Sequence, residues 1–173
     1  GVEVHAMLNE MSEPTGCAVG NALEVIEALE CLGGGGSPDL RKVVLDLSEV
    51  IAGVSRENLE GMLDDGTARR KFDELVVRQG GRVEDLERLS EIHRAPVIRE
   101  ITAPVSGVVT GVDAGKIGQA SLELGAGRSK AGDSVDFSVG FDCLAKCRDK
   151  VSAGDVIVRI HASSQEAGER AEV

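Results

Sequence analysis

The spacing of apolar residues changes near residue 95, and this change constrains the fold more than any other feature of the sequence. Before it, apolar residues recur every three or four positions, which is typical of helices that bury one face. After it, β-branched residues alternate with other residues between frequent glycines, which is typical of short strands. The order predicts an α+β chain with a helical segment over 1–95, a β-rich unit over 96–163 and a frayed tail over 164–173.

Capping residues mark the ends of the predicted helices. The first helix covers 21–32 and ends at the glycine run 33–36. Ser37 is expected to be the N-cap of the next helix, which ends at Gly53. Two shorter helices are predicted between Ser55 and Gly66 and between Thr67 and Gly80, and a weaker one over 83–92.

The β-rich unit is predicted to contain strands that one short helix interrupts. The helix covers 117–124, and the strands cover 97–101, 105–112, 135–139 and 151–160. After residue 163 no apolar periodicity remains, which is why we expect a frayed tail.

The charge balance excludes several classes of partner. The 173 residues include 19 lysines and arginines against 30 aspartates and glutamates, a net charge of −11, with neither tryptophan nor tyrosine. A nucleic acid needs a basic face, often with aromatic platforms for its bases, and an anionic membrane surface also attracts basic residues. No apolar run is long enough to span a bilayer. We therefore expect no nucleic acid and no membrane as a partner.

Cysteine usage predicts the cellular compartment. Four cysteines in a chain of this length, without a basic and apolar leader, are typical of the reducing cytoplasm and not of a disulfide scaffold. The chain opens without methionine, which indicates a processed start or a start inside a larger protein.

Several candidate motifs have a structural interpretation that we prefer to a functional one. The glycines at 33–36 precede a helix, as in a phosphate-binding loop, but Asp39 in its first turn would repel phosphate. We interpret them as a turn, like the glycines at 125 and 127. Cys143 and Cys147 have the spacing of half a zinc site, but free thiols are preferred because no second pair accompanies them. The three scattered histidines are assigned no catalytic role.

Glu24, Glu27 and Glu30 repeat at helical spacing, which usually describes a solvated face. Glu24 differs because it follows a compact stretch, 14–21, whose proline and glycines favour a turn with exposed main-chain oxygens. Carbonyl oxygens with one carboxylate suit a hard cation. The spacing alone does not choose between a cation site and a solvated face.

The segment 10–29, with the sequence EMSEPTGCAVGNALEVIEAL, closely resembles a signature of the thymidine and pyrimidine-nucleoside phosphorylases. Further segments resemble the same family in the same order: SPDLR at 37–41, QGG at 79–81, APVSGVV at 103–109, LGAGR at 124–128 and the segment 151–162 that ends in IHA. The resemblance covers nearly the whole chain.

This resemblance implies the C-terminal part of such an enzyme, with helices of its large α/β domain over 1–95 and its C-terminal hammerhead-like α/β domain over 96–163. The parent enzyme would reversibly phosphorolyse pyrimidine (deoxy)nucleosides to the free base and (deoxy)ribose 1-phosphate. In the family, the groups that bind phosphate and the pyrimidine precede the first residue of this chain. We therefore expect no catalytic residue here, no activity from this chain alone, and the missing N-terminal part of the same protein as its partner.

The resemblance also implies a cofactor. Some members of the family bind potassium through two main-chain oxygens and one carboxylate, with further ligands from the part that precedes this chain. Matching residue by residue assigns the oxygens to Thr15 and Ala18 and the carboxylate to Glu24. Three ligands are fewer than a hard cation prefers, so this chain alone is expected to bind potassium weakly or not at all.

Two alternatives come from other classes of protein. The segments 103–107 and 149–157 resemble half-motifs of biotinyl and lipoyl carrier domains, but no modifiable lysine in a hairpin-tip motif lies between them. A stand-alone interaction domain is the second alternative, and it would require a native gene that starts near residue 1.

Overall fold

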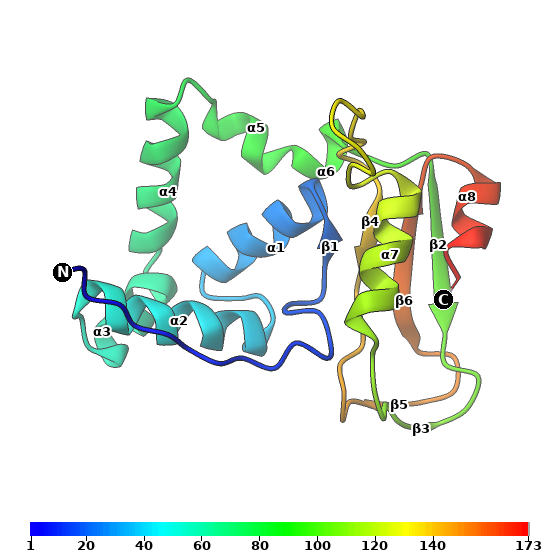
Figure 1. Cartoon of the computed structure of the whole chain (residues 1–173), viewed down its shortest axis with the longest axis horizontal. Helices are drawn as coiled ribbons and strands as arrows, with labels where there is room; N and C mark the ends of the chain where they lie inside the picture. Colours follow the sequence, from blue (N-terminus) through cyan, green and yellow to red (C-terminus); the bar gives the residue numbers. More distant parts are fainter. Residues whose placement is uncertain (173) are drawn as a thin grey trace.

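The chain folds as a group of helices beside an antiparallel sheet, in a computed structural model that describes residues 1–172 (Figure 1). This arrangement confirms the predicted α+β class. The helices are α1 (Ala22–Leu32), α2 (Pro38–Ala52), α3 (Arg56–Asp64), α4 (Thr67–Arg78), α5 (Val83–Glu87), α6 (Leu89–Ile92), α7 (Ala114–Leu124) and α8 (Gln165–Arg170). The strands are β1 (Val19–Gly20), β2 (Val97–Thr102), β3 (Gly107–Val108), β4 (Gly140–Asp142), β5 (Lys150–Val151) and β6 (Val156–Ala162).

The helices begin and end close to the predicted positions, but their caps differ in detail. Ser37 is the N-cap residue of α2, although its side chain makes no capping hydrogen bond. Gly53 ends α2 in the left-handed conformation, with a φ of 62°, as predicted. The N-cap of α4 is Gly66 and not Thr67. Thr67 is already helical, and its N–H donates to the Asp65 carboxylate at 2.7 Å.

Four strands form the main sheet in the order β1-β4-β6-β2, with every neighbouring pair antiparallel, and β3 pairs with β5 in a separate ribbon. The short strand β1 comes from the helical half of the sequence, where Val19 pairs with Phe141 and Gly20 with Gly140. The main sheet therefore contains strands from both sides of the boundary predicted after residue 95.

Three predicted strands differ from the structure. The segment 151–160 is divided between β5 and β6, which lie in separate sheets. The segment 105–112 contributes only the two residues of β3. The segment 135–139 is not a strand, because the Asp136 carboxylate accepts hydrogen bonds from the Ser138 N–H at 2.9 Å and its hydroxyl at 2.6 Å and forms a turn. The helix α7 also begins earlier than predicted, because the Asp113 carboxylate caps it by accepting the Lys116 N–H at 3.0 Å.

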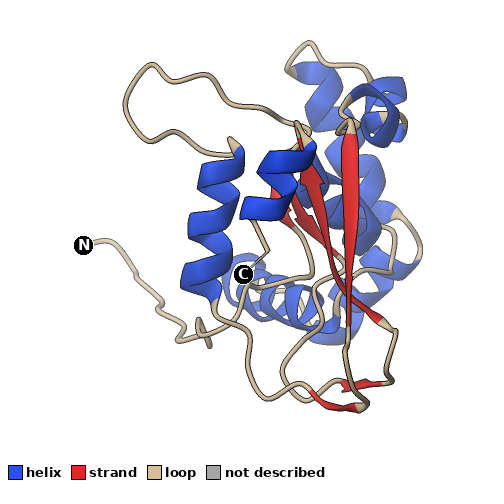
Figure 2. Cartoon of the chain, turned by 90° about the vertical axis from the view of Figure 1, so that its right-hand side faces the viewer, coloured by secondary structure: helices blue, strands red, loops and turns tan. Residues whose placement is uncertain are grey.

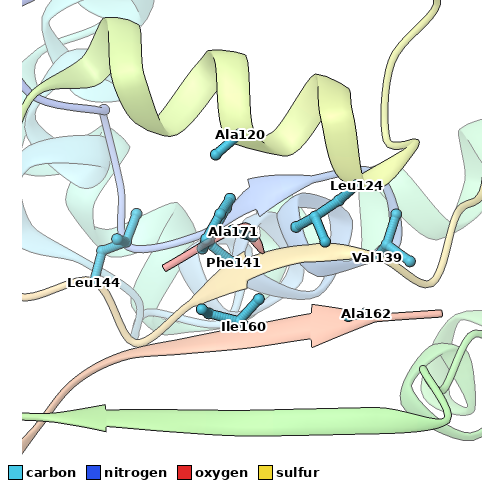
Figure 3. Packing of buried hydrophobic residues seen from close by; sticks show 8 residues of the cluster. All are labelled: Ala120, Leu124, Val139, Phe141, Leu144, Ile160, Ala162 and Ala171. Carbon is cyan, nitrogen blue, oxygen red and sulfur yellow. The ribbon is translucent and has the colours of Figure 1, made fainter. Parts of the chain in front are cut away.

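One face of the main sheet carries the hydrophobic core, which α7 covers (Figure 3). Ala167 of α8 also packs against this core. Val139, Phe141 and Ile160 have exposed fractions of 0–1%. The other core residues are Ala120, Leu124, Leu144, Ala162 and Ala171. Because side chains alternate along a strand, the residues between these core positions in β4 and β6 point to the opposite face.

The tail that we expected to be frayed is largely helical in its described part, 164–172, and residue 173 lies outside the described residues. The tail contains α8, which lies in front of the strands in Figure 2, and Ala171 is buried in the core at 5% exposure. The Ser164 hydroxyl caps α8 by accepting the Ala167 N–H at 3.2 Å. Arg99 of β2 forms ion pairs with Glu169 and Glu172. The segment of α8 is too short to show a helical period in the sequence, and the buried residues of the tail, Gly168 and Ala171, are small.

Candidate functional site

The second face of the main sheet borders a cavity of about 710 Å³, with α1 and the region around α6 on its other side. Its charged lining contains more acidic than basic side chains. The carboxylates are Glu27, Glu30, Glu91 and Asp142, and the guanidinium groups are Arg94 and Arg159. A cavity with this surplus of negative charge favours cations over anions.

A carboxylate on the sheet is the most strongly paired group of this cavity. Arg159 donates two hydrogen bonds of 2.8 Å to Asp142, one to each oxygen. His161 is 8% exposed, and its Nε2 lies 3.2 Å from Asp142 Oδ1 without good hydrogen-bond geometry. Burial opposes the ionisation of Asp142, but His161 and Arg159 outweigh it and lower the pKa of this carboxyl.

Two cysteines, Cys17 and Cys143, also line the cavity. All four cysteines of the chain are free, as predicted. Burial, with Glu27 nearby, raises the pKa of Cys17 to about 11, and burial also raises the pKa of Cys143. Both side chains are therefore neutral thiols near pH 7, which makes them poor nucleophiles.

The loop 14–18 reaches the edge of this cavity, where a buried carboxylate binds it. Glu27 of α1 is 9% exposed, and its two oxygens accept the N–H groups of Cys17 at 2.6 Å and Ala18 at 3.1 Å. Gly16 lies directly against this carboxylate. It has a φ of 80°, and a Cβ at this position would lie 2.4 Å from Glu27 Oε2. Only glycine fits here without a shift of the loop or of the Glu27 side chain.

The residues predicted to bind potassium lie on this loop and the adjoining helix. Glu24 is exposed in the first turn of α1, and its Oε1 accepts the Gly20 N–H at 2.9 Å. Among the turns, loops and caps of residues 1–172, no main-chain N–H donates to the main-chain oxygens of Thr15 and Ala18. Hard cations prefer oxygen ligands, and two carbonyls with one carboxylate are such ligands. The three residues therefore offer the type of ligand atom that potassium binds. The carboxylate that contacts the Ala18 N–H, however, belongs to Glu27.

Glu27 and Lys146 contribute to this region although no sequence motif marks them. Glu27 belongs to the acidic run that suggested a solvated face. Its burial has a signal in the sequence, because Leu23 and Cys31 lie four residues to either side on the same helix face and are also buried. Lys146 carries no such signal, because its ammonium contacts Asp39 across the fold, at 2.9 Å.

The glycine-rich stretches are turns, as predicted. In the stretch 33–36, the N–H of Gly33 donates to the Leu29 carbonyl at 3.1 Å and the N–H of Gly35 donates to the Glu30 carbonyl at 2.9 Å. These donors end α1 and are not directed at a phosphate. Gly125 ends α7 with a φ of 104°.

Within the described range, no group of three His, Cys, Asp or Glu residues is placed to hold a metal ion. Over the same range, no helix combines the length and the apolar character needed to cross a membrane.

A family model and individual relatives both show similarity of this chain to phosphorylases of pyrimidine nucleosides. Residues 108–173 match the family described as the pyrimidine nucleoside phosphorylase C-terminal domain. The chain is 34% identical, over 98% of its length, to the pyrimidine-nucleoside phosphorylase of Bacillus subtilis (strain 168), of which it covers 41%. It is 35% identical, over 99% of its length, to the thymidine phosphorylase of Burkholderia cenocepacia (strain HI2424), of which it covers 42%. It is 37% identical, over 96% of its length, to the thymidine phosphorylase of Mycobacterium tuberculosis (strain CDC 1551 / Oshkosh), of which it covers 38%.

The chain thus spans about two fifths of the length of these relatives, and the matched family model is that of their C-terminal domain. The chain is similar over nearly its whole length to thymidine and pyrimidine-nucleoside phosphorylases, and its residues 108–173 match the model of the C-terminal domain of pyrimidine nucleoside phosphorylases.

Proposed function

We propose that this chain is the C-terminal part of an enzyme that reversibly converts a pyrimidine (deoxy)nucleoside and phosphate into the free base and (deoxy)ribose 1-phosphate. The similarity of nearly the whole chain to phosphorylases, at 34–37% identity, carries this proposal. In this reaction phosphate attacks the anomeric carbon of the sugar while the base leaves. The enzyme must therefore orient both substrates and stabilise the negative charge that develops on the base.

The chain alone is expected to be inactive. Binding phosphate requires cationic side chains or N–H groups that point at the anion. The cavity between the sheet and α1 has an acidic surplus instead, and the glycine-rich turn at 33–36 uses the N–H groups of Gly33 and Gly35 to end α1. These features agree with a phosphate site supplied by the part of the enzyme that precedes this chain.

The expected partner is this N-terminal part of the same protein. The helices α2 and α3 each bury a single residue, and α4 buries none. Large apolar side chains on these helices remain exposed: Leu47, Val50, Ile51, Met62, Leu75 and Val77. In an isolated domain such surface lowers solubility, and burial against a further layer stabilises the assembly. The helices would then belong to the large α/β domain, and the β-rich unit over 96–163 would be its hammerhead-like C-terminal neighbour.

Potassium is the cofactor that we propose for the parent enzyme, bound by the main-chain oxygens of Thr15 and Ala18 and the carboxylate of Glu24. Among the turns, loops and caps of residues 1–172, no main-chain N–H donates to these two carbonyls, which supports their availability as ligands. Three oxygen ligands are too few for strong binding, so the remaining ligands would come from the N-terminal part.

The test measures the release of free base from thymidine and from uridine in the presence of phosphate. We expect no release above a buffer control with the chain alone, and release when the chain is joined to, or co-expressed with, the N-terminal part of the parent protein. Turnover by the chain alone would contradict its inactivity. No turnover by the complete, folded protein with either nucleoside would contradict the proposed reaction.

The carrier-domain alternative is not favoured by these comparisons. Mass spectrometry provides an independent check, because a biotinyl or lipoyl adduct on a lysine would add its mass to the chain. We expect the unmodified mass.

A further inference from the structure

One ammonium group of the β-rich half binds the loop 14–18 of the helical half. The Nζ of Lys146 donates to the main-chain oxygen of Gly16 at 3.0 Å and to that of Pro14. It also lies 2.9 Å from Asp39 Oδ2, at the start of α2. The Lys146 side chain is only 16% exposed, so these contacts exclude most of the surrounding water.

Lys146 and Asp39 together bind both main-chain polar groups of Gly16, its carbonyl and its N–H. Asp39 Oδ2 accepts the Gly16 N–H at 3.0 Å, while Lys146 donates to the Gly16 carbonyl and pairs with Asp39 itself. Burial opposes the ionisation of Asp39, but the ammonium and the Gly16 N–H lower the pKa of this carboxyl. The charges of this pair are thus balanced within the fold.

The backbone around Lys146 is fixed independently of the ammonium. Leu144 donates its N–H to the Cys17 carbonyl at 3.1 Å, and Cys147 donates its N–H to Glu13 Oε2 at 2.8 Å. Asp149 accepts the Lys146 N–H at 2.7 Å. These contacts do not need the side chain of Lys146, so its removal should leave the turn 144–147 beside the loop.

We propose that Lys146 is a positioning residue that acts as a tethered monovalent cation for the loop 14–18. It binds two carbonyl oxygens and a carboxylate, which is the ligand set that a free hard cation would take in this place. Through it, the β-rich half sets the conformation of the loop on which the proposed potassium ligands Thr15 and Ala18 lie. The relevance of the loop to catalysis rests on the proposed function, whereas the role of Lys146 in ordering the loop does not.

The test is hydrogen exchange of the amides of Gly16, Cys17 and Ala18 in the full-length protein, without substrates. Lys146→Met keeps most of the apolar stem of the side chain and removes the charge. We expect it to accelerate exchange of these amides about tenfold, because charge-assisted bonds to the loop are lost. Lys146→Arg keeps the charge and should remain within about twofold of the unsubstituted protein. Unchanged exchange in Lys146→Met would overturn the proposal.

Chemical rescue separates a charge effect from a packing effect. Lys146→Ala leaves space for a small alkylammonium ion, so added n-propylammonium should restore slow exchange, whereas n-propanol of the same size should not. Equal rescue by both compounds, or rescue by neither, would contradict the role of a tethered cation. The readout needs no nucleoside, so a failure of the proposed phosphorolysis would not alter it.

Discussion

Arg159 and Asp142 face each other across β6 and β4, and the guanidinium donates a hydrogen bond of 2.8 Å to each carboxylate oxygen. The pair lies on the sheet face opposite the core, where His161 approaches the same carboxylate. It places charged groups in the cavity between the sheet and α1.

Arg159→Met should lower the free energy of unfolding by about 1–2 kcal/mol, because the half-buried Asp142 carboxylate loses both donors. Urea denaturation measures this change. Arg82→Met is the matched control, because Arg82 makes the same kind of pair with Asp85 on an exposed helix. The control should change stability little. Equal losses in the two variants would contradict a special role of the Asp142 pair.

Asp142→Asn should flatten the acid side of the stability profile. The pKa of Asp142 is lower in the folded chain than in the unfolded chain, so its ionisation contributes stability above the unfolded pKa. This contribution is lost as the pH falls below about 4 toward the folded pKa. Urea midpoints between about pH 3 and pH 6 should therefore decline less in Asp142→Asn than in the unsubstituted chain. Parallel declines would show that Asp142 does not titrate in this way.

Gly16→Ala should destabilise the chain more than Gly53→Ala. Both glycines have positive φ, but a Cβ at Gly16 meets the Glu27 carboxylate at 2.4 Å, whereas a Cβ at Gly53 meets nothing within 4 Å. We expect a loss of about 1 kcal/mol for Gly53→Ala and at least about 2 kcal/mol for Gly16→Ala. Thermal unfolding of the two variants measures the difference, and similar melting temperatures would show that Glu27 moves away at little cost.

Deletion of 164–173 should lower the melting temperature by roughly 5 °C or more, because it uncovers core residues around Ala171 and removes the partners of Arg99. Deletion of 1–10 is a control of equal length, since this segment is mostly exposed and forms no helix or strand. The control should change the melting temperature little. A small effect of both deletions would mean that the C-terminal helix adds little stability.

The sequence was sufficient to predict elements with strong local signals. The helices α1 and α2 combine an apolar stripe with clear end signals, and both appear near the expected positions. The strand β2 combines β-branched residues with alternation and also appears where expected. The strand β6 covers only the second part of the segment predicted over 151–160 and extends it to Ala162.

The remaining features depend on contacts between distant residues. β1 has only two residues, and pairing with β4 defines it. α8 is too short to show a period and is stabilised by its position over the core. The same holds for the region around the loop 14–18, because local spacing does not show that Lys146 meets Asp39. Matching residues to the family assigned the carboxylate ligand to Glu24. In the structure, the buried carboxylate that accepts the loop N–H groups belongs to Glu27.

Glu24→Gln in the full-length enzyme should weaken the dependence of activity or thermal stability on potassium. The substitution removes the charge that would balance the cation, while the amide oxygen can still accept the Gly20 N–H that Glu24 accepts now. Glu30→Gln is the control, because Glu30 is exposed on the same helix and is not among the proposed ligands. Titration with potassium chloride at constant ionic strength, with choline as the replacement cation, measures the response.

Glu27→Gln gives the decisive comparison, because both oxygens of Glu27 accept N–H groups of the loop. We expect it to lower stability with and without potassium, since an amide group can satisfy only one of these donors. Glu24→Gln should instead shift the potassium concentration at half effect and leave stability in choline unchanged. If Glu24→Gln keeps the full potassium response and Glu27→Gln abolishes it, the carboxylate ligand is Glu27, and the assignment to Glu24 is wrong by about one helical turn.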